Sequence, residues 1–345
     1  MTPGKEKIRF ALVGCGYIGR KHAALISAHP EAELVALADT NADALATLQA
    51  TAPGANTYPS LPELLAGSDQ VDVVVIATPN GHHAEAALDC LAGGKHIVLE
   101  KPIALNKTDA ERIIFRALNA HKHVFGVMQN RYSPPVRWLK GMVDNGILGR
   151  VALLEISCFW NRDARYYRRG TWHGTRALDG GTLFTQFSHF IDILYWVFGD
   201  IDAIAARMTS FNHAGLTEFE DSGIVTFRLV EGGGLGSLCF STSVWDKNME
   251  SSMTVIAENG TIKIGGQYMD RVEYCHVRDY ELPDLPSTAP GNDYGVYQGS
   301  AANHHYVIDN VVDVLKGRAS VATNALEGLK VVEMIERIYR AAVVE

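Results

Sequence analysis

The sequence predicts an α/β protein of two domains: a doubly wound parallel sheet, followed by an α+β domain with a large, mainly antiparallel open sheet. Three observations carry this prediction. Residues 8–39 follow the order strand, glycine turn, helix and strand, and strands then alternate with helices to about residue 130. From about residue 149, long β-type runs separated by glycine turns replace that alternation. We therefore expect domains at 1–130 and 131–345, and the last helix could pack back on the first domain.

The composition is that of a globular enzyme and narrows the range of partners. The chain has 345 residues, of which 47% are hydrophobic and 20% charged, and its net charge is −8. This acidic balance, without a basic patch, argues against nucleic acid and anionic membrane surfaces as partners. No signal-peptide pattern precedes the first strand and no apolar stretch could span a bilayer, so we expect a cytosolic protein. Five scattered cysteines without a Cys-x-x-Cys pair argue against disulfides and a zinc site, and we expect no metal.

The glycine turn at 14–19 (GCGYIG) follows an apolar strand and opens a helix. Gly14 allows the tight turn, Gly16 lets a pyrophosphate approach the backbone, and Gly19 lets the helix pack close to the sheet. The free N–H groups and positive dipole end of the helix suit a phosphate anion. The alternative is a glycine turn in a doubly wound fold that binds no nucleotide.

Asp39 ends the next apolar run, 20 residues past the last glycine of the turn. A carboxylate at this distance can accept both hydroxyls of an adenosine ribose. Because the same carboxylate would repel a 2′-phosphate, the sequence favours NAD over NADP as cofactor. The residues that we assign to this half of the dinucleotide are Gly14, Gly16, Tyr17, Ile18, Gly19 and Asp39.

Polar side chains also follow the later strands of the first domain. In an open α/β sheet, ligands bind beyond the carboxyl ends of the strands. These side chains should therefore lie beside the nicotinamide half of a dinucleotide bound at the glycine turn. The residues that we assign to this half are Thr78, Asn80, His83, Glu100, Lys101 and Gln129.

Two residues are candidates for proton transfer. Lys101 lies in Glu100-Lys101-Pro102, where a neighbouring cationic nicotinamide would help it to give up its proton and handle that of an alcohol. His189 lies in a helix predicted over 183–198, four residues after Thr185 and on the same helix face. Histidine can take a proton near neutral pH. The alternatives are a surface lysine in a loop and a histidine satisfied inside a domain interface.

The polar loop at 161–179 combines arginines with aromatic residues. Arginine pairs well with carboxylate and phosphate, and aromatic rings cover a sugar or uracil face. The alternative is a solvated basic loop or a subunit contact. The arginines are Arg162, Arg165, Arg168, Arg169 and Arg176. Our candidates for substrate contacts are Arg162, Tyr167 and Trp172 from the loop, with Thr185, Gln186 and His189 from the helix and Lys101 from the first domain.

His304 and His305 are adjacent near the end of the chain. No further histidine or cysteine has a spacing that would complete a metal site with them. We therefore assign the two histidines to packing or to substrate contact.

Together, the glycine turn, Glu100-Lys101-Pro102 and the helix containing His189-Phe190-Ile191-Asp192 resemble the Gfo/Idh/MocA family over essentially the whole chain. The resemblance implies an enzyme in which a nicotinamide dinucleotide takes hydride from a sugar or cyclitol carbinol. Lys101 would then bind the reacting hydroxyl and His189 would be the acid/base. Members are usually dimers or tetramers, and we expect a homotetramer. The family often has Asp four residues before the His, where this chain has Thr185, so we expect Lys101 and His189 to act without that carboxylate.

Within the family, the chain is similar to nucleotide-sugar 3-dehydrogenases of the WlbA/WbpB type. This resemblance implies oxidation of C3 of UDP-N-acetylglucosaminuronic acid in O-antigen sugar synthesis for lipopolysaccharide, in some members with 2-oxoglutarate recycling a tightly held NAD(H). Three alternatives stay open: a myo-inositol or aldose dehydrogenase, a non-catalytic dinucleotide-sensing regulator, and a structural protein built on a dead dehydrogenase fold. The similar stretches are Phe159-Trp160-Asn161-Arg162, Tyr166-Tyr167, Trp172-His173-Gly174-Thr175, Asp179-Gly180-Gly181 and the residues around 292–304.

Overall fold

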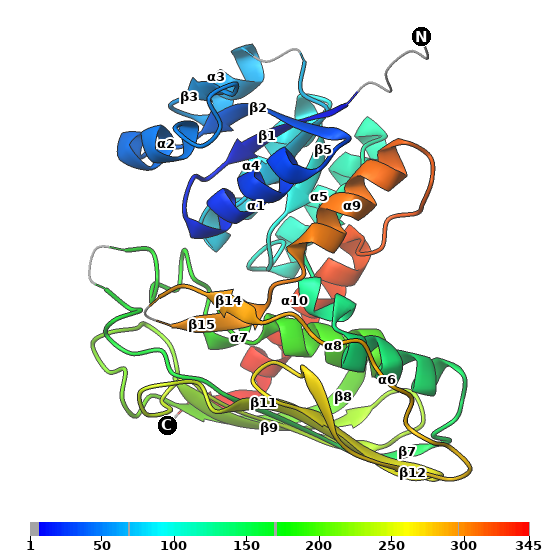
Figure 1. Cartoon of the computed structure of the whole chain (residues 1–345). Helices are drawn as coiled ribbons and strands as arrows, with labels where there is room; N and C mark the ends of the chain where they lie inside the picture. The colour runs from blue at the N-terminus through cyan, green and yellow to red at the C-terminus, as the bar shows by residue number, and fades with distance from the viewer. Residues whose placement is uncertain (1–6, 68–69, 169–170, 296, 345) are drawn as a thin grey trace. The chain divides into compact units, whose positions relative to one another are not determined.

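The computed structural model describes residues 7–67, 70–168, 171–295 and 297–344, which form two compact units (Figure 1). Unit 1 comprises the chain up to Val127 together with His304–Leu329, and unit 2 comprises Met128–Asn303 with the chain from Lys330 onward. The predicted boundary at 130/131 thus lies close to the end of the first part of unit 1. Residues 304–329, which we assigned to the second domain, instead belong to unit 1.

Helix α9 (His304–Leu315) explains why this late segment belongs to unit 1. It packs against α1 (Tyr17–Ala28), and its apolar face, with Val307 and Val311, is buried. Ion pairs just past its C-terminus reinforce the contact, because Lys316 and Arg318 both bind Glu31. A helix far along the chain therefore completes the first unit.

The sheet of unit 1 has six strands in the order β3-β2-β1-β4-β5-β6, and all neighbours are parallel. The order reverses between β1 and β4, which is where doubly wound sheets bind ligands. β4 is fully buried, as a parallel strand covered on both faces should be. The strands are β1 (Ile8–Val13), β2 (Ala32–Ala38), β3 (Asn56–Tyr58), β4 (Val73–Ile76), β5 (His96–Leu99) and β6 (Val124–Gly126).

The other helices of unit 1 follow the strands in the predicted alternation. The side chains of Asn41 and Asn106 accept N–H groups in the first turns of α2 and α5, so both helices begin at capping residues. The helices are α2 (Ala42–Gln49), α3 (Leu61–Gly67), α4 (His83–Ala92) and α5 (Lys107–Ala120), with a 3₁₀ turn η1 (Asn80–His82) before α4.

The large sheet of unit 2 has eight strands in the order β13-β12-β11-β7-β10-β9-β8-β16. Only β7–β10 and β8–β16 are parallel pairs in this sheet as described, which confirms the predicted, mainly antiparallel sheet. The strands are β7 (Val151–Phe159), β8 (Ile201–Thr209), β9 (Ser222–Leu229), β10 (Leu235–Ser241), β11 (Glu250–Ala257), β12 (Gly260–Gly265), β13 (Arg271–Val277) and β16 (Ala342–Val344).

The core of unit 2 lies between the inner face of this sheet and the helix α8 (Ser188–Phe198). Trp160, just past β7, forms edge-on contacts with Phe187 and Phe190, and Phe187 also contacts Phe240 of β10. The remaining elements of unit 2 are η2 (Gln129–Tyr132), α6 (Pro134–Asp144), α7 (Thr182–Thr185), a small β14 (Gly291–Asp293)–β15 (Gln298–Ala301) ladder and the part of α10 (Ala325–Ala341) from Lys330 onward.

The helix predicted over 183–198 is two helices, α7 and α8. The N–H of Phe187 bonds to the carbonyl of Thr182, and the backbone of Phe187 leaves the helical region at φ −113° and ψ 4°. The chain therefore makes a wider, π-type turn and is redirected between Thr185 and His189. The prediction that these two residues share one regular helix face is wrong for this reason.

Candidate active site

The glycine turn of unit 1 has the close contacts that require glycine. Gly14 has a φ of +95°, and a Cβ there would lie 2.4 Å from the carbonyl oxygen of Ala77. A Cβ on Gly19 would lie 1.9 Å from the carbonyl oxygen of Gly14. At Gly16, by contrast, nothing lies within 4 Å of the Cβ position. The turn therefore leaves open space at the start of α1, which fits a pyrophosphate that approaches the backbone.

The surroundings of this space suit the rest of a dinucleotide. α1 begins at Tyr17 without a side-chain cap and without an acidic residue in its first turn, so its N–H groups can bind an anion. The Oδ2 of Asp39 accepts the N–H of Cys15 at 2.6 Å, and its Oδ1 accepts the N–H of Asn41 at 2.7 Å. These bonds hold the carboxylate beside the turn and leave lone pairs for ribose hydroxyls. Ile18 is half-buried in the same turn of α1.

Three residues assigned to the nicotinamide side follow β4. The Oγ1 of Thr78 is buried and has no hydrogen-bond partner among the described residues, so a bound ligand could satisfy it. His83 is buried at the start of α4, and its Nδ1 and Nε2 lie 2.7 Å and 2.9 Å from the carbonyl oxygens of Pro102 and Thr78. Burial lowers the pKa of His83. His83 thus links the ends of β4 and β5, while Asn80 is buried in η1 between them.

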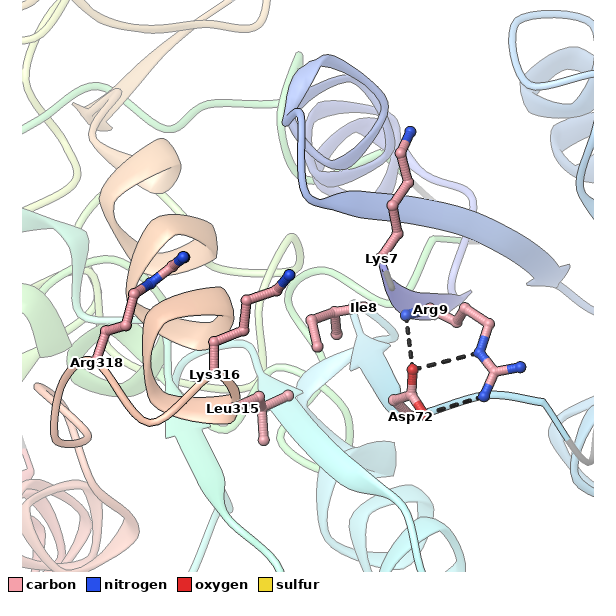
Figure 2. Close-up of a pocket in the computed structure, with 7 residues that line it drawn as sticks. All are labelled: Lys7, Ile8, Arg9, Asp72, Leu315, Lys316 and Arg318. Atoms are coloured by element: carbon pink, nitrogen blue, oxygen red, sulfur yellow. Dashed lines mark hydrogen bonds and ion pairs between the residues drawn. The ribbon is translucent and has the colours of Figure 1, made fainter. Parts of the chain in front are cut away.

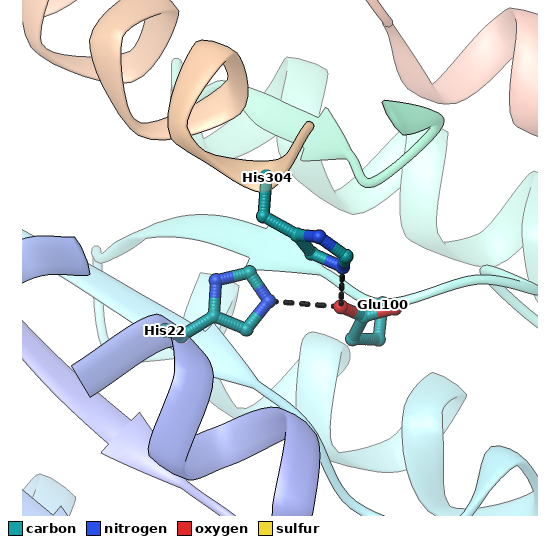
Figure 3. A group of neighbouring side chains, drawn as sticks. All are labelled: His22, Glu100 and His304. Carbon is teal, nitrogen blue, oxygen red and sulfur yellow. Dashed lines mark hydrogen bonds and ion pairs between the residues drawn. The ribbon is translucent and has the colours of Figure 1, made fainter. Parts of the chain in front are cut away.

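Glu100 is the centre of a buried polar cluster at the carboxyl end of β5 (Figure 3). Its Oε1 lies 2.8 Å from Nε2 of His22 in α1 and 3.8 Å from Nε2 of His304 in α9. Its Oε2 accepts the N–H of Lys101 at 3.2 Å. Burial acts to raise the pKa of Glu100, but the His22 hydrogen bond and the charges of His22 and Lys101 bring it below its ordinary value.

The same three side chains offer ligand atoms within 4.8 Å of one another. An ion bound tetrahedrally at 2.0–2.2 Å would separate its ligand atoms by about 3.4 Å. The 2.8 Å between His22 and Glu100 is instead an ordinary hydrogen-bond length. We therefore describe His22, Glu100 and His304 as a hydrogen-bonded cluster. His304 also packs edge-on against His22, a contact between distant residues that the sequence could not show.

His189 is held in unit 2, near the start of α8. Its Nε2 lies 3.2 Å from the amide nitrogen of Gln129, which also donates to Oγ of Ser300 at 3.2 Å. All three residues are buried. Gln129, which we assigned to the nicotinamide side, therefore belongs to the same unit as His189, whereas Lys101 belongs to unit 1.

Thr185 contacts a carboxylate that the sequence did not place there. Its hydroxyl is hydrogen-bonded to the side chain of Asp179 and lies 2.8 Å from the carbonyl oxygen of Asp179. The other carboxylate oxygen accepts the N–H of Gly174 at 2.7 Å, and Asp179 is fully buried. The expectation that Lys101 and His189 act without the family's usual carboxylate at 185 stays a prediction. Asp179 was visible in the sequence only as the residue before a glycine pair.

Arg162 is a buried cation within a cage of aromatic rings. Its guanidinium lies 4.9 Å, 5.3 Å and 4.7 Å from the ring centres of Trp160, Tyr166 and Tyr297. No carboxylate among the described residues lies within 4.0 Å of it. Its hydrogen bonds go to Oε1 of Gln186 at 2.8 Å, Oδ1 of Asn248 at 3.2 Å and the carbonyls of Asn161 and Gln298 at 2.5 Å and 3.0 Å. Because of burial, its pKa is lowered.

The rest of the arginine-rich loop does not form one anion site. Arg165 is exposed and pairs with Asp163 and Asp246, and Arg176 donates to the carbonyl of Glu218. Arg168 is exposed, and Arg169 lies outside the described residues. Among the described arginines of the loop, only Arg162 is buried.

The two aromatic candidates of the loop differ in their surroundings. Tyr167 is buried in a cluster with Phe219, and its ring lies 5.2 Å from that of His213. This is a packing environment. Trp172 is half-buried and stacks on His173 at 4.0 Å, so it keeps a partly open face.

A pocket lies at the amino edge of the unit 1 sheet, lined by residues that precede or open β1 and β4 and that end or follow α9 (Figure 2). Arg9 is paired with Asp72 there, and Lys316 and Arg318 are paired with Glu31. Because ligands of doubly wound sheets bind at the carboxyl edge, we do not assign the cofactor to this pocket.

In the described part of the chain, no helix has both the length and the apolar character needed to cross a membrane.

The two units and their polar clusters define an α/β oxidoreductase that uses a nicotinamide dinucleotide. Residues 8–128 match the model of an oxidoreductase family with an NAD-binding Rossmann fold, and residues 136–263 match the GFO/IDH/MocA C-terminal domain. The chain belongs to the Gfo/Idh/MocA family of oxidoreductases. This confirms the family resemblance found in the sequence, and NAD is the cofactor that fits its first unit.

Two solved structures are similar to the chain over nearly its whole length. The WlbA dehydrogenase from Bordetella pertussis, in complex with NADH and UDP-GlcNAcA, is 32% identical with a TM-score of 0.85, covering 97% of this chain and 96% of that one. The WlbA dehydrogenase from Chromobacterium violaceum, with the same two ligands, is 30% identical with a TM-score of 0.87, covering 98% and 94%. The chain spans about half the length of the curated relatives it matches. One is a myo-inositol 2-dehydrogenase from Thermotoga maritima, 29% identical over 44% of this chain and 45% of the relative.

Proposed function

We propose that the chain is an NAD-dependent dehydrogenase that oxidises C3 of the sugar in UDP-N-acetylglucosaminuronic acid (UDP-GlcNAcA), for O-antigen sugar synthesis. One observation carries the proposal: Arg162 is a buried cation that no described carboxylate neutralises. The likeness to two WlbA dehydrogenases that hold UDP-GlcNAcA supports the same substrate.

The electrostatics of Arg162 favour an anionic substrate. Taking a guanidinium out of water is costly unless a countercharge or well-placed hydrogen bonds compensate for the lost hydration. Carbonyl and amide oxygens and three aromatic rings supply part of that compensation here. The carboxylate or diphosphate of UDP-GlcNAcA would supply the missing charge. myo-Inositol and free aldoses are neutral and would leave Arg162 without it.

The proposed roles extend the assignments made from the sequence. NAD, when bound, supplies the hydride acceptor. Lys101 binds and polarises the reacting hydroxyl at the end of β5. His189, next to Gln129 and Ser300, takes the proton of that hydroxyl. The proposed substrate contacts are Arg162, Thr185, Gln186 and Trp172, with Tyr167 acting mainly through packing.

The first test is a substrate panel with purified protein. We would mix it with NAD and UDP-GlcNAcA, with and without 2-oxoglutarate, and follow a 3-keto product by mass spectrometry and NADH by absorbance. A keto product from UDP-GlcNAcA, with much less from UDP-N-acetylglucosamine, is the expected result. NADH formation only with myo-inositol or an aldose would overturn the substrate assignment. Binding of NAD without hydride transfer to any substrate would favour a regulator.

Two variants test the roles of the reacting residues. Lys101→Ala and His189→Asn should each lower kcat by roughly 10²–10⁴-fold, because each removes a group that handles the alcohol proton. Affinity for NADH should stay within a few-fold in both. The half-buried Lys122→Ala is a matched control. Full turnover in the Lys101→Ala variant would contradict the mechanism.

We also propose that the enzyme is a homotetramer of the cytosol, where its nucleotide-sugar substrate and NAD would be available. An apolar stripe on the exposed face of the unit 2 sheet supports assembly. Leu235, Leu153 and Ile256 are direct neighbours on β10, β7 and β11, and 62%, 40% and 42% of their surfaces are exposed. A second copy of the chain would cover this stripe.

A further inference from the structure

We propose that Glu100 makes the cofactor site favour the oxidised, cationic form of NAD over NADH. The inference depends on NAD as the cofactor and not on the identity of the sugar. It rests on the hydrogen bonds that hold Glu100, on its position along the sheet edge, and on the charge difference between the two forms of the cofactor.

The hydrogen bonds of Glu100 are those of an ionised carboxylate. It accepts from Nε2 of His22 at 2.8 Å and from the N–H of Lys101 at 3.2 Å, and the second histidine, His304, also turns Nε2 towards it (Figure 3). The hydrogen bond from Nε2 of His22 therefore fixes the orientation of the Glu100 carboxylate.

The topology of unit 1 places this charge on the nicotinamide side. Asp39, the ribose candidate, follows β2 on one side of β1, and Glu100 follows β5 on the other side. A dinucleotide whose pyrophosphate lies at the end of β1 must therefore extend its nicotinamide half towards β4 and β5. Two strand spacings, about 10 Å, separate the ends of β1 and β5 along the sheet.

The two forms of the cofactor differ by one charge at the nicotinamide ring. The ring is cationic in NAD⁺ and neutral in NADH, so only NAD⁺ gains attraction from a nearby carboxylate. The ammonium group of the adjacent Lys101 acts in the opposite direction. Glu100 therefore offsets the repulsion between the Lys101 ammonium group and the oxidised nicotinamide ring. Both cations can then lie close together in one site.

Affinities measured on matched variants test this role. We would measure the Kd values of NAD⁺, NADH and ADP-ribose by calorimetry for the native protein, Glu100→Gln and Glu100→Asp. ADP-ribose lacks the nicotinamide and reports whether the rest of the site is intact. Glu85→Gln, an exposed change on α4, is the control.

Glu100→Gln should weaken NAD⁺ by about tenfold relative to NADH, with ADP-ribose unchanged within about twofold. Glu100→Asp keeps the charge and should keep most of the native protein's ratio of NAD⁺ affinity to NADH affinity. Equal losses for NAD⁺ and NADH in Glu100→Gln, or no change in their ratio, would overturn the proposal and leave Glu100 with a purely structural role.

Further variants guard against misfolding of Glu100→Gln. If that variant fails to bind ADP-ribose, Glu100→Met has a similar size, leaves no buried amide unpaired and should show the same tenfold change. Lys101→Met removes the opposing charge and should raise the affinity for NAD⁺ relative to NADH. If Lys101→Met instead lowers this relative affinity, as the Glu100 variants should, the electrostatic account would be contradicted.

Discussion

We propose that Asp39 combines a structural and a recognition role in one side chain. Its two oxygens accept the N–H groups of Cys15 and Asn41, so the carboxylate is fixed beside the glycine turn before any ligand arrives. A preordered carboxylate favours ribose hydroxyls and repels a 2′-phosphate. The proposed preference for NAD over NADP therefore depends on one residue in a defined orientation.

The Asp39→Ala variant should lose most of the preference for NAD over NADP. Removing the carboxylate abolishes both its bonds to the ribose and its repulsion of the phosphate, so the two affinities should approach each other within about tenfold. Calorimetric Kd values for both cofactors measure this. Glu33→Ala, an exposed change on β2, is the control. An unchanged preference in Asp39→Ala would refute the ribose argument.

At the scale of elements, a buried ion pair joins η2 to α8 in unit 2. Arg131 donates to both oxygens of Asp192 at 2.8 Å and 2.6 Å, and both side chains are almost fully buried. The Arg131 guanidinium also lies 5.3 Å from the ring centre of Trp196. The pair holds the segment with Gln129 against the helix with His189, which are the two sides of the His189 site.

Removing one partner of this pair should be costly, because the other charge stays buried. We expect Asp192→Asn to lower the free energy of unfolding by roughly 3–5 kcal/mol. Urea denaturation followed by circular dichroism measures it. The exposed pair Arg228–Asp202 offers the control, since Asp202→Asn should hardly move the midpoint. An equal loss in both variants would argue against burial as the reason.

Another contact between elements depends on pH. Tyr339 of α10 donates its hydroxyl to Glu220 at 2.6 Å and accepts the N–H of Leu183 at 3.1 Å. Burial is the largest cause of the raised pKa of Glu220. The Glu220 carboxyl group therefore holds its proton more tightly in the folded protein than in the unfolded chain. The stability that the protonated Glu220 contributes is present below its unfolded pKa and is lost as the pH rises through its folded pKa.

Glu220→Gln keeps an acceptor for Tyr339 but has no charge to bury. The variant should therefore melt at a higher temperature than the native protein at neutral pH, and the difference should shrink as the pH falls towards the ordinary range of a carboxyl group. Thermal melts at several pH values measure this. The exposed Glu231→Gln should show no such trend. A difference that grows at acid pH would contradict the raised pKa.

At the scale of the whole molecule, the outer face of the unit 2 sheet predicts assembly. Leu153 is at the centre of the apolar stripe, between Leu235 and Ile256. Leu153→Lys should convert the proposed tetramer into a smaller species without loss of secondary structure, because a charge cannot be buried there. Light scattering coupled to size exclusion measures the mass. Leu118→Lys, exposed on α5, is the control. A native protein that is monomeric would refute the proposal.

Much of the first unit could be predicted because its signals are local. The glycine turn, the apolar run before it and the acid 20 residues later belong to one continuous segment, and neighbouring peptide units impose that geometry. The change from alternating strands and helices to β-type runs likewise predicted the mainly antiparallel sheet. The break between α7 and α8 was missed, since apolar residues continue across it and only the backbone of Phe187 departs from a helix.

The sequence by itself determined the fold class and the cofactor, because these depend on backbone conformation and on periodicity along short segments. The tertiary structure alone decided that Arg162 is buried, that Asp179 reaches Thr185, and that α9 returns to unit 1 and brings His304 to Glu100. Each of these depends on contacts between residues distant in the chain or on the direction of a side chain. Such contacts are fixed by packing of the whole chain, which no local pattern encodes.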